Sequence, residues 1–219
     1  MSDKILKMPS LQEQVYLYIK SAIVKGELQI GELYSEQWCS DLLGVSRTPV
    51  REAVLKLKQD NLLEIIPYRG FTVKTLSPED VKETFEIRQA LEGFCVIRIA
   101  QKYRDPGAQD VLARLEGYLR EQSNFKNEKN IYEFMELDEL YHRDIISFSR
   151  NERLADTFHS IHNRFQRITV KVLKEPGRIG STIKEHATIL AEMKRGDPWA
   201  SYRLMSEHLN ETRRIVEAL

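Results

Sequence analysis

Cysteine, long apolar runs and an excess of charge of one sign are scarce or missing in this chain. The two cysteines, Cys39 and Cys95, lie among apolar neighbours in separate predicted helices, which predicts reduced core thiols rather than a disulfide. No run approaches the roughly 18 apolar residues of a membrane-spanning helix, and the first residues lack the apolar stretch of a signal peptide. We therefore expect a cytoplasmic protein with no membrane partner.

The charges balance, with 33 basic and 33 acidic side chains, so binding to a polyanion would need a local basic patch. Hydrophobic residues make up 42% of the chain, which is enough for buried cores, and 219 residues suit two domains of ordinary size. Strand patterns end before Thr75. We therefore expect one domain over residues 1–75 and a second, all-helical domain over residues 76–219.

A helix-turn-helix pattern lies within the first of these domains. Residues 35–43 predict a short helix, and Gly44 then opens a turn before a second helix whose first turn is polar and basic. In a helix-turn-helix protein this second helix enters the major groove of DNA. Arg47 and Arg51 are four residues apart, so both lie on one face, and arginine can donate two hydrogen bonds to a guanine edge or a phosphate. An ordinary surface helix with Ser46 as its N-cap is the alternative for this segment alone.

A predicted hairpin follows the second helix. Two β-branched runs, 62–66 and 71–74, flank a turn at 67–70. Between positions 46 and 74 there are six basic side chains and three acidic ones, which is the local surplus that the whole chain lacks. A basic hairpin directly after a helix-turn-helix is typical of a winged DNA-binding module, and the amphipathic segment 11–25 would complete its core.

Residues 10–74 resemble the winged helix-turn-helix of the GntR family of bacterial transcription regulators. The matching residues are Gly31-Glu32-Leu33, Ser35-Glu36, Leu43-Gly44-Val45-Ser46-Arg47-Thr48-Pro49-Val50-Arg51-Glu52-Ala53, Leu57, Leu62 and Arg69-Gly70-Phe71-Thr72-Val73. The contacts that the resemblance implies are with bases or phosphates for Arg47 and Arg51, with phosphates for Ser46 and Thr48, and with the minor groove for Arg69 and Gly70. The chain departs from the family at Gln37, where a basic residue is common.

The second half of the sequence predicts an antiparallel all-α bundle of about six helices, so the expected fold class of the chain is mostly α. The first helix has a clear start, because Ser77 can cap it, Pro78 takes its first position and two acids follow. Breaks rich in Gly, Pro, Asp and Asn separate the helices expected at 78–103, 107–126, 130–149, 152–174, 181–195 and 198–218.

Polar side chains interrupt the apolar faces of three of these helices. Asp138 and His142 are four residues apart on the apolar face of the helix at 130–149, while His186 and His208 lie on the apolar faces of the last two helices. A buried carboxylate needs a partner, and one divalent cation would satisfy Asp138 and the three imidazoles together. Three nitrogens and one oxygen suit Zn²⁺, Ni²⁺, Fe²⁺, Mn²⁺ or Co²⁺. Hydrogen-bonded core histidines and an Asp paired with Arg or Tyr are the alternative.

Residues 78–218 resemble the all-helical, FCD-type effector domain of the GntR subgroup that includes the fatty-acid-responsive regulator. Many members of that group use Asp-x-x-x-His on one helix and a His on each of two later helices as metal ligands. The resemblance therefore implies a metal site at Asp138, His142, His186 and His208. Arg88 interrupts the apolar face of the first helix, where it could hold the carboxylate of an effector or pair with Glu92, four residues on.

We therefore expect a ligand-responsive transcription regulator, with repression as the favoured mode of action, and not an enzyme. A homodimer would place two winged modules on two half-sites of double-stranded operator DNA. A small carboxylate effector that reaches the metal would then change the operator affinity. The alternatives are a pure metal sensor, a metal that only ties the bundle together and a metal-dependent enzyme, for which no His-Glu-x-x-His or nucleophile motif is present.

Overall fold

The computed structural model describes residues 9–125 and 130–218. The chain divides into two compact units with the boundary between Thr75 and Leu76, and each unit has its own apolar core. Within the described ranges no helix is long and apolar enough to cross a membrane. The expectation about the first residues, and most of the expected break at 127–130, lie outside the described residues.

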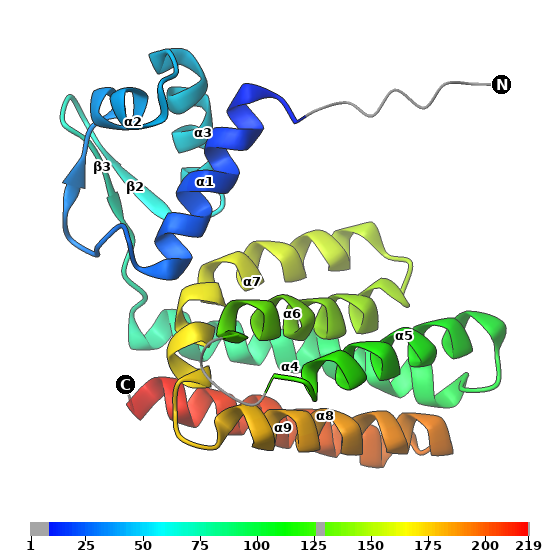
Figure 1. Cartoon of the computed structure of the whole chain (residues 1–219). Helices are drawn as coiled ribbons and strands as arrows, with labels where there is room; N and C mark the ends of the chain where they lie inside the picture. The colour runs from blue at the N-terminus through cyan, green and yellow to red at the C-terminus, as the bar shows by residue number, and fades with distance from the viewer. Residues whose placement is uncertain (1–8, 126–129, 219) are drawn as a thin grey trace, which may run out of the picture. The chain divides into compact units, whose positions relative to one another are not determined.

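The first unit consists of helices and a small antiparallel sheet (Figure 1). Its elements are α1 (Leu11–Lys25), β1 (Leu33–Tyr34), α2 (Glu36–Leu43), α3 (Arg47–Gln59), β2 (Leu63–Ile66) and β3 (Gly70–Val73). Strand β3 is central and pairs with both β1 and β2. The sequence did not predict β1, because alternation of apolar and polar residues cannot be recognised over two residues.

Local signals in the sequence set the ends of the first helix. The Ser10 hydroxyl accepts a hydrogen bond from the backbone N–H of Glu13 at 3.2 Å, and Gly26 ends α1 in the left-handed conformation. Apolar side chains of α1 and α3 pack against those of the sheet to form the core of this unit. Its most deeply buried members are Ile19, Ile23, Val50, Ala53, Leu57 and Phe71.

The second unit is the predicted all-α bundle, and the mostly-α fold class is confirmed. Its described helices are α4 (Pro78–Gln101), α5 (Pro106–Gln122), α6 (Ile131–Ser147), α7 (Glu152–Leu173), α8 (Arg178–Arg195) and α9 (Pro198–Ala218). The Ser77 start is a capping box with Asp80, as its sequence suggested. Helix α8 begins three residues before the expected position, because Gly177 takes the left-handed conformation (φ 79°) and turns the chain directly into the helix.

Helices α4, α6, α8 and α9 surround the interior of the bundle, and α8 and α9 run alongside each other (Figure 1). Helices α4 and α9 pack closely at Gly93, where an added Cβ would lie 2.6 Å from the ring of Tyr202. Apolar side chains fill most of the space between the helices, including Ile99, Leu112, Leu115, Ile145, Ile189, Met193, Met205 and Leu209. The polar residues of the candidate site lie within this apolar shell.

Candidate DNA-binding surface and metal centre

The polar and basic end of α3 lies on the surface of the first unit. Val50, Ala53 and Leu57 point into the core, so the opposite face of the helix carries the exposed residues Ser46, Arg47, Thr48 and Arg51. Ser46 has the backbone geometry of an N-cap, but its hydroxyl makes no capping hydrogen bond. The side chains of Arg47, Thr48 and Arg51 are therefore exposed together at this end of α3, beside the Ser46 hydroxyl, which does not cap the helix.

The β2–β3 hairpin is the predicted wing. Arg69 is exposed at its turn, next to Gly70. A Cβ added at Gly70 would collide with the carbonyl oxygen of Tyr34 in β1, and the φ of 130° is one that L side chains rarely adopt. Packing of the sheet alone thus requires glycine at this position, and contact of Gly70 with DNA stays a prediction.

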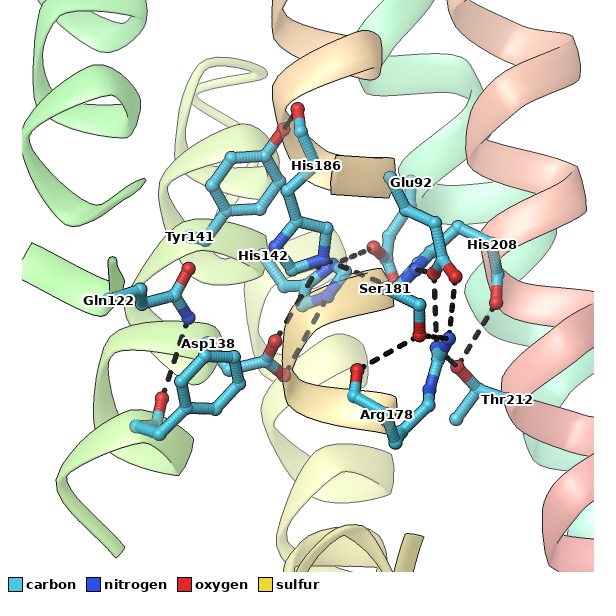
Figure 2. Close-up of polar contacts among 12 residues, drawn as sticks. Glu92, Gln122, Asp138, Tyr141, His142, Arg178, Ser181, His186, His208 and Thr212 are labelled. Carbon is cyan, nitrogen blue, oxygen red and sulfur yellow. Dashed lines mark hydrogen bonds and ion pairs between the residues drawn. The ribbon is translucent and has the colours of Figure 1, made fainter. Parts of the chain in front are cut away.

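Three imidazoles meet in the interior of the second unit (Figure 2). His142 from α6, His186 from α8 and His208 from α9 each offer a nitrogen within 4.8 Å of the other two, and all three side chains are buried. The Nε2 atoms of His186 and His208 are 3.3 Å apart. Tyr141 stacks on the ring of His186, with 4.2 Å between the ring centres, and donates its hydroxyl hydrogen to the carbonyl oxygen of His186 at 2.9 Å. The tyrosine therefore fixes the orientation of this imidazole.

Asp138 lies one helical turn before His142 on α6 and faces the same space. Its carboxylate oxygens lie 3.8 Å from Nε2 of His186 and 3.9 Å from Nε2 of His142, which is too far for hydrogen bonds. Its Oδ1 is buried and has no hydrogen-bond partner among the described residues. A buried carboxylate oxygen beside imidazole nitrogens is the environment of a cation ligand. The four residues predicted to bind a metal therefore lie together, and they fit a divalent ion.

Two carboxylates, one fully buried (Glu92) and one partly exposed (Glu185), contact two of the imidazoles at the nitrogen that faces away from Asp138. Glu92 Oε2 lies 2.5 Å from Nδ1 of His142, and Glu185 Oε2 lies 2.6 Å from Nδ1 of His208. An imidazole that donates from Nδ1 carries its lone pair on Nε2, so both rings present an acceptor atom to the space beside Asp138. His186 differs, because its Nδ1 has no hydrogen-bond partner among the described residues.

An arginine stabilises each of these carboxylates. Arg88 Nε donates to Glu92 at 2.7 Å, and Arg178 donates to both oxygens of Glu185 at 2.6 and 3.1 Å. Of the two alternatives for Arg88, the ion pair with Glu92 is thus formed, and contact with an effector stays a prediction. Arg178 also donates to the hydroxyl of Thr212 on α9 at 2.9 Å (Figure 2).

Burial and charge set the protonation of the cluster. Burial raises the pKa of the Glu92 carboxyl, but Arg88 and His142 outweigh it and lower that pKa to about 2. Burial likewise raises the pKa of Glu185, while its partners His208 and Arg178 lower it to about 2. Burial and the neighbouring imidazoles hold the pKa of His186 well below its usual value. At neutral pH the carboxylates are therefore ionised and His186 is neutral, which is the form of imidazole that binds metal.

Each of the two units matches a known protein family. Residues 83–211 match the FCD domain, and residues 11–73 match the bacterial regulatory proteins of the gntR family. The chain belongs to the GntR family. Its first unit is accordingly the operator-binding domain of a transcriptional regulator, and its second unit is an FCD domain.

The relatives of this GntR-family chain are regulators as well. The HTH-type transcriptional repressor RspR of Escherichia coli (strain K12) is 27% identical over 209 residues, which are 95% of this chain and 90% of RspR. The solved structure of E. coli McbR/YncC has the same fold, with a TM-score of 0.76 and 23% identity over 96% of this chain and 99% of that one. The predicted class of the protein, a DNA-binding transcriptional regulator and not an enzyme, is confirmed.

FCD domains bind metal in some members of the family. One solved structure is described as the metal-free FCD domain of TM0439; it is 18% identical, covers 65% of this chain and 95% of its own, and has a TM-score of 0.51. That likeness concerns the fold alone. Support for a metal in this chain therefore comes from the geometry of its own histidines and Asp138.

The sequence does not indicate every residue around the three histidines. It suggests Glu92 only as a partner of Arg88, and it does not link Glu185 or Arg178 to the site. Glu185 adjoins His186 on α8 and so points away from it, but it reaches His208 on α9. General chemistry could have indicated these carboxylates, because a histidine that binds metal through one nitrogen usually donates a hydrogen bond from the other to a carboxylate or carbonyl.

Proposed function

We propose that this GntR regulator holds a divalent metal ion in its FCD domain and uses it to bind a small carboxylate effector that changes operator affinity. The observation that carries the proposal is the proximity of three buried imidazoles to Oδ1 of Asp138, a buried atom with no hydrogen-bond partner in the described part of the chain. Neutral imidazoles and one carboxylate suit Zn²⁺, Ni²⁺, Fe²⁺, Mn²⁺ or Co²⁺.

The protein's own residues supply the rest of the binding site. Glu92 and Glu185 orient His142 and His208, and the stacked ring of Tyr141 orients His186. A bound ion would supply positive charge to a small anion. Rigid orientation of the ligands before the ion binds favours high affinity, because little conformational freedom is then lost.

Unpartnered polar atoms near the cluster support an organic ligand beside the ion. The Nε of Arg178 and the hydroxyl of Thr182 are buried without hydrogen-bond partners among the described residues. Arg178, Thr182 and His186 are spaced four residues apart on α8, so they share one face of the helix. The oxygen atoms of a small carboxylate would accept hydrogen bonds from these two donors. Arg88, which the sequence indicates as an effector-binding residue, would add a second positive charge near the carboxylate.

A homodimer is part of the proposal. Operator sites with two half-sites require two winged modules. Helix α4 supports a dimer contact, because Ile87 (38% exposed) and Phe94 (45% exposed) are seven residues apart and therefore lie on one exposed face. Apolar side chains that repeat on one outer face of a helix suit an interface between subunits.

Metal analysis of the purified protein tests the proposal. We expect about one divalent ion per chain in the wild type, since one set of three His and one Asp forms a single site. The variants His186→Ala and His208→Ala should lose the ion, while His159→Ala, which changes an exposed histidine of α7, should keep it. A wild-type protein without metal, with a melting temperature that does not respond to a chelator, would rule out the metal site.

The same material separates an effector-responsive regulator from a pure metal sensor. Operator binding is measured with the ion removed and restored, without any organic acid present. If operator affinity follows the metal alone, the ion is the signal; if it does not, and a carboxylate screen finds acids that change it only in the loaded protein, the ion is part of an effector site.

A further inference from the structure

The wing carries a strained aromatic residue that neither the core nor the sheet uses. Tyr68 has a φ of 64°, one of only a few non-glycine residues with positive φ in the described part of the chain. It occupies the third position of the turn that the Arg69 N–H closes with the Ile66 carbonyl at 3.1 Å, with Pro67 at the second. Glycine and asparagine are the residues that take this conformation readily, while a bulky side chain is disfavoured there.

The side chain of Tyr68 is also fully exposed, at 109% of its reference area. No hydrogen bond or ring contact joins it to another described residue. The fully exposed ring contributes no burial free energy to the stability of the fold. The positive φ costs backbone free energy, so the free protein gains no stability from having tyrosine at this position. Its neighbour Arg69 is exposed in the same turn.

The turn nonetheless holds Tyr68 in a defined direction. Strands β2 and β3 pair up to Ile66 and Gly70, the two residues that flank the turn, and Pro67 restricts the backbone just before Tyr68. A backbone whose conformation is set before binding loses little freedom when the residue binds, so only the rotamers of the exposed ring remain to be ordered. The paired strands therefore hold the backbone of Tyr68 and Arg69 in a defined conformation at the tip of the wing.

We propose that Tyr68 is a DNA-contact residue of the wing, whose ring lies against the deoxyribose wall of the minor groove beside Arg69. This inference rests on the proposed binding of operator DNA by two winged modules, with the wing in the minor groove as the family resemblance implies for Arg69 and Gly70. The sugars offer the ring an apolar surface, and a tyrosine hydroxyl can donate a hydrogen bond to a phosphate oxygen. The contact is with sugar and phosphate, so it adds affinity and fixes the position of the wing without reading a base.

Substitution by the residues that the turn prefers provides the test. The variants are Tyr68→Gly and Tyr68→Asn, which fit the positive φ, and Tyr68→Phe, which keeps the ring and removes the hydroxyl. The probe is a duplex selected from a random-sequence library with the wild-type protein. Binding is measured over a range of salt concentrations, together with hydroxyl-radical footprints and thermal melting.

Tyr68→Gly and Tyr68→Asn should melt no lower than the wild type, because both relieve backbone strain. Both should nevertheless bind the duplex several-fold more weakly, with an unchanged dependence on salt and with weaker protection of the deoxyribose carbons under the wing. Tyr68→Phe should retain most of the affinity if the ring makes the contact. The unchanged salt dependence distinguishes Tyr68 from Arg69→Ala, which should reduce the salt slope by about one.

Wild-type affinity and footprints in Tyr68→Gly would overturn the inference. If Arg69→Ala is weakened at the same time, the failure concerns Tyr68 alone. If Arg69→Ala also binds and protects the duplex as the wild type does, the proposed entry of the wing into the minor groove is overturned together with the role of Tyr68.

Discussion

Glu185 does not face the space between the three imidazoles, yet it decides how His208 presents a nitrogen to that space. Its carboxylate accepts the Nδ1 hydrogen of His208 and is itself held by Arg178. Glu92 does the same for His142 with Arg88. Carboxylates behind metal-binding histidines fix the ring and its tautomer, so their loss weakens metal binding although no ligand is removed.

The substitution Glu185→Gln is expected to weaken metal binding by about 10- to 100-fold, because the amide cannot supply the negative charge that stabilises the His208 ring. The measurement is competition for the ion with a chelator of known affinity. Glu207→Gln is the matched control, since it changes an exposed glutamate of the neighbouring helix α9 that pairs with exposed Arg203. Equal affinities in the wild type and Glu185→Gln would show that Glu185 does not tune the site.

Arg88 offers a second test, because its two proposed roles predict different outcomes. Arg88 is 6% exposed and pairs with fully buried Glu92. Removing one partner of a buried ion pair leaves an uncompensated charge, so Arg88→Ala should lower the free energy of unfolding by ~3–5 kcal/mol in a denaturant titration. Unchanged stability together with a lost response to carboxylates would instead assign Arg88 to the effector alone.

Among the helices, α3 carries the clearest link between sequence and function. Its apolar residues at 50, 53, 54 and 57 are buried, and this orients the arginines at 47 and 51 outward. The same pattern could be recognised in the sequence because helix periodicity fixes which residues share a face. Their exposure is compatible with contacts to DNA, and these contacts stay a prediction that binding measurements can test.

Arg47→Ala and Arg51→Ala should each weaken binding to the selected duplex, by ~1–3 kcal/mol where the contact is bidentate to a base. Arg203→Ala, which removes an exposed arginine of α9, is the charge-matched control and should bind as the wild type does. A loss that is uniform over all sequences and lowers the salt slope would indicate a phosphate contact instead. Normal affinity in both variants would exclude α3 as the helix that contacts DNA.

The helix ends show how far the sequence could predict the fold. Ser10, Gly26 and the Ser77–Asp80 capping box lie within a few residues of the helix that they begin or end, so local chemistry was sufficient. The start of α8 and the strand β1 were missed. The conformation of Gly177 and the pairing of β1 with β3 depend on the folded chain, which local patterns do not contain.

The same limit applies to the candidate metal site. Asp138 and His142 share one helix face, and His186 and His208 interrupt apolar faces, so the sequence could nominate all four residues. Their convergence depends on the packing of α6, α8 and α9, and the pairing of Glu185 with His208 joins two helices. Spacing within one helix cannot predict a contact between helices.

For the regulator as an assembly, the proposed dimer contact on the outer face of α4 would link the FCD domain to operator binding. Phe94 is exposed in the single chain, so Phe94→Asp should leave the fold intact and place a charge in the proposed interface. Sedimentation velocity should show a dimer in the wild type and a monomer in the variant. Because a dimer joins two DNA-binding modules, the variant should bind a duplex with two half-sites about 10²-fold more weakly or worse.

Trp199→Asp is the control for this change, because it places the same charge at an even more exposed aromatic residue (73%) on another helix, at the start of α9. It should remain dimeric and bind normally. If Phe94→Asp also remains dimeric, the subunits associate through another surface and α4 is free. If it becomes monomeric yet keeps full affinity, one winged module is enough for the operator, and the effector cannot act by changing the separation of two modules.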